Sequence, residues 1–190
     1  MKDNYENLDI KKLADNQLVE LILKRDQELF GEIIFRYQQK LFYYVNRLIN
    51  HPDEAQDIVQ DVFLKVFKNL WGYDSRLKFS SWIYRIAHNE AVNWLKKNTR
   101  YKKESIDQNE YLEATLYDET DFVEDLNIKA DIEKVHLAIA QLPEKYREVL
   151  ILKFVEEKSY EEISDILMKP VNTIGVLINR GRKILKNQLK

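Results

Sequence analysis

The chain has 190 residues, of which 45% are hydrophobic and 33% charged, a composition typical of a soluble globular protein long enough for two small domains. It contains no cysteine, which excludes disulfide frameworks and thiolate metal sites. It has no apolar run long enough to span a bilayer and its first twelve residues are polar, so we expect a cytoplasmic protein without direct membrane insertion.

The net charge of -2 conceals a segregation of charge along the chain. Residues 78–103 contain seven basic side chains and one acid, Glu90, whereas residues 104–125 contain nine acids and no base. Two basic surfaces separated by an acidic connector are therefore expected. A basic surface is typical of proteins that bind nucleic acid.

Four helices are predicted in the first half, because four glycines and three prolines in the whole chain leave little material for hairpins. The first spans residues 15–24 and the second ends near Ile49. The third begins at Pro52, and the fourth is capped by Ser80 or Ser81 and ends near Lys97. The apolar stripe of the third helix predicts its core residues: Ala55, Ile58, Val59, Val62, Phe63, Val66, Phe67 and Leu70.

The second half predicts a helix-turn-helix. Helices are expected over residues 131–140 and 144–156, and Ser159 with Glu162 forms a capping box that starts a short helix at Tyr160. Pro170 ends that helix and the next one begins near Val171. A second helix held across a first by a short turn is the geometry that enters a DNA major groove, although a helical hairpin with a solvated basic face has the same pattern.

The fold class predicted is therefore all-α, with two small helical domains joined by an acidic flexible linker. We place the first domain at residues 1–100, the linker at 101–127 and the helix-turn-helix domain at 128–190.

Leu64 is out of place on the polar side of the third helix. It lies one turn from Gln60 and beside Asp61, and two turns from Asp57. An apolar side chain inside a hydrophilic face is typical of a small protein-binding hot spot, but single exposed leucines are also common. The sequence leaves both interpretations open.

Aromatic, basic and amide side chains alternate along the fourth helix. Arginines suit phosphates, aromatic rings stack on unpaired bases, and asparagine can bond a base edge. Tryptophans such as Trp82 and Trp94 are better explained as core residues. Tyr84, Arg85 and Asn89 share a face partly distinct from that core and are the better candidates for binding nucleotides.

Three blocks of this sequence resemble extracytoplasmic-function sigma factors of bacterial RNA polymerase, which belong to the sigma-70 family. The blocks are D-I-V-Q-D-V-F-L-K-V-F-K-N-L at residues 57–70, F-S-S-W-I-Y-R-I-A-H-N-E-A-V-N-W-L at 79–95, and L-P-E-K-Y-R-E-V-L with S-Y-E-E-I within 142–163. They stand in the order and at the spacing of that family, and the resemblance covers nearly the whole chain apart from the connector.

The resemblance implies a partner or a DNA element for each surface. The polar face of the third helix would dock on the β′ clamp helices of core RNA polymerase, with the β flap as a further contact. The loop at residues 74–78 and the asparagine of R-I-A-H-N would form a pocket for a flipped base. An inhibitory anti-sigma factor is also a common partner in the family, and the sequence does not show where one would bind.

The resemblance also assigns individual residues to core polymerase and to the two promoter elements. Core polymerase would be bound by Asp57, Gln60, Asp61 and Leu64. The minus-ten element would be bound by Lys65, Tyr84, Arg85, Asn89 and Asn93. The minus-thirty-five element would be bound by Lys153, Asn172, Thr173, Val176, Asn179, Arg180, Arg182 and Lys183.

The sequence departs from the family in the second helix of the helix-turn-helix. Members usually carry Lys or Arg, then Ser, then Arg where this chain has Gly175, Val176 and Leu177. We therefore expect the groove-facing part of this helix to lack three polar groups, and DNA binding there to rest chiefly on contacts to phosphates and to thymine methyls. Met168 also stands where a turn glycine is common.

Two other classes of function were weighed. A DNA-binding regulator that never joins the polymerase would need a ligand or receiver domain in the first half, and none is legible. An enzyme is disfavoured because His51, His88 and His136 have no metal-ligand spacing and no glycine-rich phosphate loop is present. His88 is expected on a helix surface. No catalytic residue, metal, cofactor or small-molecule substrate is predicted.

Overall fold

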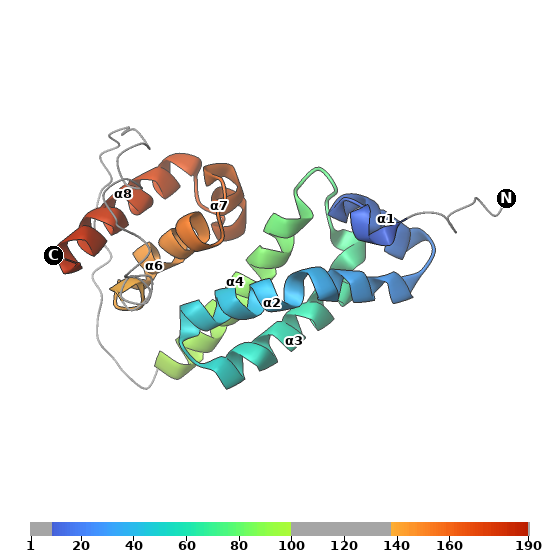
Figure 1. Ribbon diagram of the computed structural model, residues 1–190, viewed down its shortest axis with the longest axis horizontal. Coiled ribbons are helices and arrows are strands. Elements are labelled where there is room, and N and C mark those ends of the chain that lie inside the picture. Colours follow the sequence, from blue (N-terminus) through green and yellow to red (C-terminus); the bar gives the residue numbers. More distant parts are fainter. Residues whose placement is uncertain (1–8, 100–137, 190) are drawn as a thin grey trace.

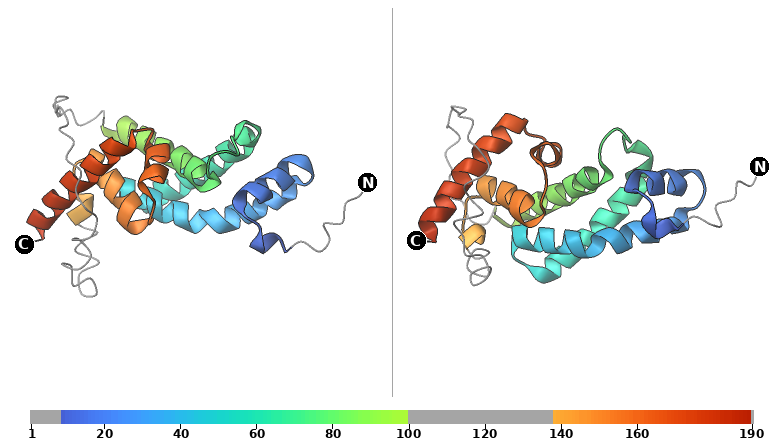
Figure 2. Two further views of the ribbon diagram at one scale, coloured as in Figure 1. Left: turned by 90° about the horizontal axis from the view of Figure 1, so that it is seen from above. Right: turned by 45° about the horizontal axis from the view of Figure 1, so that its top comes forward.

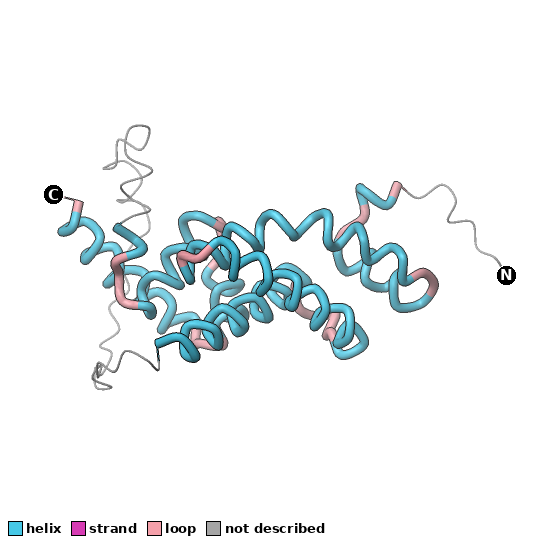
Figure 3. The backbone as a smooth tube through the Cα atoms, turned by 90° about the horizontal axis from the view of Figure 1, so that it is seen from below, coloured by secondary structure: helices cyan, strands magenta, loops and turns pink. Residues whose placement is uncertain are grey.

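The computed structural model describes residues 9–99 and 138–189, and within these ranges it contains helices and loops but no strand. Figure 3 shows the helices joined by short loops. The predicted linker over 101–127 and most of the predicted helix over 131–140 lie outside the described residues. No described helix is both long and apolar enough to cross a membrane.

Four α-helices form the first half, and Figure 1 shows α2, α3 and α4 running side by side. Their bounds are α1 Asp15–Lys24, α2 Phe30–Ile49, α3 Pro52–Asn69 and α4 Phe79–Thr99. Short 3-10 segments precede α1, precede α2 and follow α3, at Ile10–Lys12, Gln27–Leu29 and Leu70–Gly72. The four predicted helices are therefore confirmed.

Local chemistry sets the ends of these helices. α2 ends at Ile49, and the cap residue Asn50 takes the left-handed conformation (φ 53°) that asparagine tolerates better than most residues. Pro52 then opens α3, where a missing N–H costs nothing. The fourth helix differs from the prediction, because it already begins at Phe79 and places Ser80 and Ser81 inside its first turn rather than at its cap. The buried ring of Phe79, which packs edge to face on Tyr37, fixes that earlier start.

The core of the first half lies between α2, α3 and α4. Fully buried aliphatic side chains from all three helices meet there: Ile33, Leu41, Val45, Ala55, Val62, Val66 and Ile83. The predicted stripe of α3 is buried except for Phe67, which is 40% exposed. Its ring packs edge to face on Phe30 at 5.0 Å, at the rim of a groove between α2 and α3, and this groove keeps it accessible to solvent.

The second half contains α6 Glu144–Leu150, α7 Tyr160–Leu167 and α8 Val171–Gln188, after a helical turn at residues 138–140. The predicted helix over 144–156 is present, but it widens into a π-helix at Ile151–Val155. The capping box is confirmed, because Ser159 Oγ accepts from the amide of Glu162 and Glu162 Oε2 accepts from the amide of Ser159. α7, a short turn and α8 form the predicted helix-turn-helix.

The two halves pack against each other through α4 and α7. Figure 1 shows the second half against one side of the first, with α7 nearer to α4 than α8 is, and Figure 2 gives two further views of this packing. The interface of the two halves therefore falls on the helix where the nucleotide-binding residues are predicted.

Candidate functional site

The polar face of α3 carries the predicted protein-binding patch. Asp57, Gln60, Asp61 and Leu64 are all exposed, and Leu64 is 57% exposed in spite of its apolar side chain. Leu64 also lines the groove between α2 and α3, whose other walls include Phe30, Ile34, Phe42, Phe63 and Phe67. An apolar groove rimmed by polar side chains is typical of a site for another protein. The interpretation of Leu64 as a lone surface leucine is therefore weakened.

Four of the five predicted nucleotide-binding residues lie on α4 and the fifth lies on α3. Asn89 and Asn93 are exposed, and Lys65 of α3 pairs with Glu90 of α4 at 2.5 Å. This ion pair holds the two helices in register and brings Lys65 beside the α4 surface. The set is not brought together on one face of α4, because Asn89 and Asn93 are exposed whereas Tyr84 is buried.

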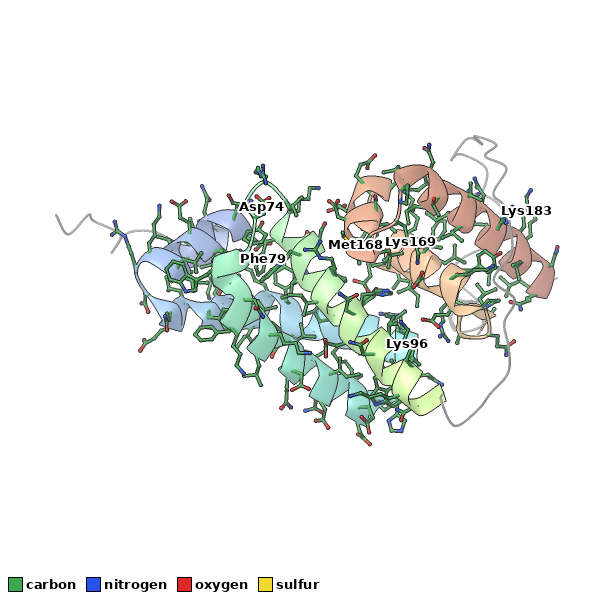
Figure 4. All side chains as sticks on the ribbon, turned by 180° about the vertical axis from the view of Figure 1, so that it is seen from behind. Asp74, Phe79, Lys96, Met168, Lys169 and Lys183 are labelled. Atoms are coloured by element: carbon green, nitrogen blue, oxygen red, sulfur yellow. The ribbon has the colours of Figure 1, made fainter. Side chains whose placement is uncertain are left out.

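Tyr84 and Arg85 of the same set are engaged by the second half. Tyr84 is only 1% exposed, and its hydroxyl donates to Glu156 Oε2 at 2.6 Å. Burial, together with the nearby Glu156 carboxylate, raises the pKa of the Tyr84 hydroxyl well above its usual value. Arg85 Nη1 lies 3.3 Å from Met168 Sδ, in the turn between α7 and α8. Figure 4 shows Met168 and Lys169 on the side of the second half that faces α4.

The loop before α4 is fastened to α1. The Tyr73 hydroxyl lies 2.7 Å from Asn16 Oδ1 and 2.5 Å from the carbonyl of Leu77, and Asn16 Nδ2 donates to the carbonyl of Ser75 at 3.0 Å. Within the loop, hydrogen bonds from Arg76 lower the pKa of Asp74 to about 2. The loop, with Asp74 at its start in Figure 4, is thus held in one conformation beside the first turn of α4.

His88 corrects the prediction of a surface residue, because it is only 8% exposed. Its Nδ1 lies 3.1 Å from the hydroxyl of Tyr44 and its Nε2 lies 3.5 Å from Glu148 of α6. Burial of the ring, with a smaller effect of the positive charge of Lys169, lowers the pKa of His88 to about 4. The prediction failed because packing of the second half, which covers this side of α4, has no signal in the sequence of α4 itself.

Glu148 is the acidic partner in this buried cluster. It is 4% exposed and bonds to the ammonium group of Lys169. Burial nevertheless raises its pKa, because Lys169 offsets only part of the loss of hydration. Two further acids of the second half face the first half: Glu156 lies 3.8 Å from Arg47, and Glu162 lies 3.2 Å from Lys78.

These three glutamates and Arg47 were missed as functional residues. One signal was legible: Glu148 stands one helical turn before Leu152 in the apolar run E-V-L-I-L, where a charge must find a partner if it is buried. Glu156 and Glu162 carry no such signal, because surface glutamates are common.

The surface of α8 holds the predicted minus-thirty-five residues. Asn172 and Lys183 are exposed, and the remaining members on the helix are partly exposed: Thr173, Val176, Asn179, Arg180 and Arg182. The first turn of α8 contains no acid, so its positive end is not neutralised. Lys153 lies apart from α8, in the π-helix, with its Nζ 4.8 Å from the ring centre of Tyr160.

Gly175, Val176 and Leu177 were all expected to face the DNA groove, and this prediction is wrong for Leu177. Leu177 is 8% exposed and belongs to the core, because it shares the apolar stripe of Ile174 and Ile178. Gly175 and Val176 are partly exposed, so only two positions of the trio belong to the accessible side of α8. Met168 has φ 53°, which confirms a left-handed turn at the position where glycine is common.

No group of three or more His, Asp or Glu side chains in residues 9–99 and 138–189 is arranged to hold a metal ion.

Comparison with known proteins gives the family. The Sigma-70 region 2 family matches residues 33–101, and the Sigma-70 region 4 family matches residues 132–185. The chain is 34% identical to the ECF RNA polymerase sigma factor SigW of Bacillus subtilis over 179 residues, which cover 90% of this chain and 95% of the relative. It is 31% identical to the ECF RNA polymerase sigma-E factor of Escherichia coli, with 95% of this chain and 96% of the relative covered.

A solved structure shares the fold. CnrH, in complex with the cytosolic domain of CnrY, superposes with a TM-score of 0.68 at 20% identity, over 93% of this chain and 97% of CnrH. Both sigma-70 regions match, and the relatives above 30% identity are covered over 95% and 96% of their length. The chain therefore belongs to the extracytoplasmic-function sigma factors of the sigma-70 family.

Proposed function

We propose that this chain directs RNA polymerase to promoters and assists promoter melting at the start of transcription, through two domains of divided function. Residues 1–100 bind core polymerase and the minus-ten element, residues 101–127 link the domains, and residues 128–190 bind the minus-thirty-five element. The chain performs no catalysis of its own, since the polymerase carries out the chemistry, and it acts in the cytoplasm, where its promoter DNA lies.

The observation that carries this proposal is the exposed Leu64 in a polar face beside an apolar groove. Asp57, Gln60 and Asp61 supply a polar rim around it, and the groove between α2 and α3 supplies an apolar depression beside it. This combination suits the β′ clamp helices of core polymerase. The β flap is proposed as a contact of the second domain.

The minus-ten element is proposed to bind along α4. Asn89 and Asn93 offer amide groups to base edges, Lys65 and Arg85 offer charge to phosphates, and Tyr84 offers a ring for stacking. The loop fastened to Asn16 is proposed to shape a pocket for one unpaired base. In support, this loop is tied to α1 by side-chain hydrogen bonds and does not depend on backbone contacts alone.

The minus-thirty-five element is proposed to bind α8, with phosphates held by Arg180, Arg182 and Lys183. Val176 is partly exposed and suits a thymine methyl. Asn172, Thr173 and Asn179 are proposed to add polar contacts, and Lys153 is proposed to bind the flanking DNA backbone. An anti-sigma factor is proposed as a regulatory partner, as in other members of the family.

The test is binding to purified core polymerase. Leu64→Arg should weaken core binding by about 2 kcal/mol or more, because it places a charge in the centre of the patch. The fold should stay intact because the side chain is exposed. Asn98→Arg adds the same charge at another exposed helical position of the first domain and serves as the control.

Equal affinity of the Leu64 and Asn98 variants for core polymerase would refute the assignment of the α3 patch. Transcripts started by the reconstituted holoenzyme, mapped at their 5′ ends, would then define the promoter. A holoenzyme that starts no transcripts from any cellular DNA would refute the function itself.

A further inference from the structure

A stripe of exposed side chains continues along α3 beyond the predicted protein-binding patch. Asp57, Gln60 and Leu64 of that patch are followed at the same helical spacing by Phe67 and Trp71, and all five are exposed. The steps of three, four, three and four residues are those of a helix face that packs along another helix. The stripe begins with polar side chains and is apolar from Leu64 to Trp71.

Trp71 is the member of this stripe that the core of the first half explains least. It is 74% exposed, the highest value among the large apolar side chains of residues 9–99 and 138–189. It therefore contributes little to the core, and with Leu64 and Phe67 it forms a continuous exposed apolar surface at the end of α3. Such surfaces mark sites of interaction, and tryptophan is the residue most enriched among binding hot spots.

A small hollow beside Trp71 is continuous with the groove between α2 and α3. It has a volume of about 220 Å³, and its walls include Leu23 of α1, Leu70 and the rings of Phe67 and Trp71. Gln27 and Phe67 line both the hollow and the groove. Sites for small molecules usually start at about 300 Å³, so the hollow suits a single apolar side chain of a partner better than a free ligand.

The charges around the stripe favour a protein over a nucleic acid. Asp53, Asp57 and Asp61 are exposed toward its polar end, where they would repel phosphates. Lys68 is exposed at its apolar end, beside the hollow. An amphipathic helix with basic side chains over the aspartates and apolar side chains over Leu64 and the hollow would complement both ends of the stripe.

We propose that the core-binding surface of this chain continues past Leu64 to Phe67 and Trp71, and that the hollow beside Trp71 receives an apolar side chain of the docked polymerase helix. This inference rests on the proposed function, because it adds a second anchor to the same surface. Leu64 and Trp71 are seven residues apart, roughly 10 Å along a helix. One helix lying along α3 can therefore contact both anchors at once.

The test measures binding of the full chain to purified core polymerase. Trp71→Ala removes the proposed anchor, and Trp71→Phe keeps a ring beside the hollow. Phe35→Ala is the matched control, because Phe35 is an aromatic residue of the same half, is 70% exposed, and is not among the walls of the groove or the hollow. Trp71→Ala should bind core at least about tenfold more weakly than Phe35→Ala, and Trp71→Phe should stay within about threefold of the parent.

A second readout follows the accessibility of the hollow. The parent chain contains no cysteine, so Lys68→Cys introduces a single thiol beside the hollow and Phe35→Cys introduces one away from it. Each variant is treated with iodoacetamide with and without core, and alkylation of the peptide that carries the thiol is quantified by mass spectrometry. Core should slow alkylation at position 68 about tenfold, because interface anchors are shielded from water, and should leave position 35 unchanged.

Equal core affinities of Trp71→Ala and Phe35→Ala overturn the extension, and so does equal alkylation at position 68 with and without core. If Trp71→Ala keeps its core affinity but loses affinity for a fluorescein-labelled random-sequence single-stranded DNA, the indole binds bases and the proposal is wrong. Leu64→Arg separates this inference from the proposed function. If it weakens core binding and Trp71→Ala does not, only the extension fails, whereas a parent chain that does not bind core overturns the proposed function itself.

Discussion

Two glycines of α8 illustrate how differently the same residue can act within one helix. A Cβ at Gly181 would lie 3.1 Å from Leu150 Cδ1 and 3.3 Å from Tyr146 Cβ, both in the core between α6 and α8. A Cβ at Gly175 would meet only Tyr160 Cε2, at an ordinary 3.7 Å. Gly181 therefore allows two helices to approach closely, whereas Gly175 carries no packing role and leaves a helix position without a side chain.

Alanine substitutions should separate these roles. Gly175→Ala should stabilise the chain by about 1 kcal/mol, because alanine loses less backbone entropy in a helix. Gly181→Ala should destabilise it by about 1 kcal/mol, since the fully buried Leu150 cannot move aside without repacking and this cost exceeds the same helical gain. Urea unfolding of both variants measures the free energies, and a Gly181 variant as stable as the Gly175 variant would contradict the close approach.

The elements follow largely from the sequence, and the reasons are local. α1 begins at Asp15, α3 at Pro52, α7 at Tyr160 and α8 at Val171, all as predicted, because caps and prolines act within one turn of the chain. The start of α4 was missed because it depends on the ring of Phe79 packing against Tyr37, forty-two residues away in sequence. Phe67 was misjudged for a similar reason, because its exposure is decided by the neighbouring helix α2. Leu177 was legible as a core residue from the apolar stripe of α8, and the comparison with the family pattern misplaced it.

The candidate site also has a part that could be predicted from local sequence and a part that depends on contacts with distant residues. The accessible α3 patch could be predicted, because an exposed Leu64 is visible as a break in the polar pattern of a single helix. The burial of Tyr84 and His88 could not be predicted from α4, since their partners Glu156 and Glu148 lie in the other half of the chain.

The side chains of α8 lead us to expect that it binds DNA mainly through contacts to phosphates. Its accessible side has Gly175 and Val176 where polar side chains are usual in the family, while Arg182 and Lys183 follow one to two turns later. Binding of the full chain to duplexes bearing the minus-thirty-five element should therefore weaken steeply with salt. Arg182→Gln and Lys183→Gln should each lower the slope of log K against log salt by about one, because each lost contact leaves one counterion unreleased.

Competition with duplexes that carry a randomised minus-thirty-five element would measure how strongly α8 discriminates between DNA sequences. Discrimination should be modest, with a preference for thymines near Val176. A sharp consensus containing guanines would contradict phosphate-dominated binding, because it would require direct base contacts by Asn172, Asn179 or Arg180.

At the scale of the whole molecule, the packing of the halves should depend on pH through His88. Its neutral ring is buried between Tyr44 and Glu148, with Lys169 and Lys96 as the nearby positive charges. The Glu148 carboxylate favours the protonated ring, but Lys169 neutralises much of that charge and burial dominates. The pKa of His88 is about 4 when the halves are packed and returns toward its ordinary 6.5 when they separate.

The separated state therefore binds more protons between these two pKa values, so packing is strongest above pH 6.5 and weakens as the pH falls through that range. The equilibrium should shift toward separation by about tenfold between pH 7.5 and 5.5. Burial raises the pKa of Glu148, so protonation of Glu148 favours packing at low pH and acts in the opposite direction to His88. The ion pair of Glu148 with Lys169 is kept after separation, because both residues belong to the second half.

Small-angle scattering of the full chain across this pH range would record the change as an increase in the radius of gyration at low pH. His88→Gln cannot be protonated and should flatten the profile between pH 7.5 and 5.5. Identical profiles for the parent and this variant would mean that another group controls the packing.

The order of the two halves along the chain has a consequence for a protein still being synthesised. α4 ends at Thr99 and α7 begins at Tyr160, so the ribosome completes the minus-ten surface before it has made the helix that covers it. At about 5–20 residues per second, the intervening residues take roughly 3–12 s to translate. During that interval every nascent copy exposes Tyr84 and the groove of α2 and α3 together. A newly made first half can therefore meet nucleic acid or polymerase before its own C-terminal half is made.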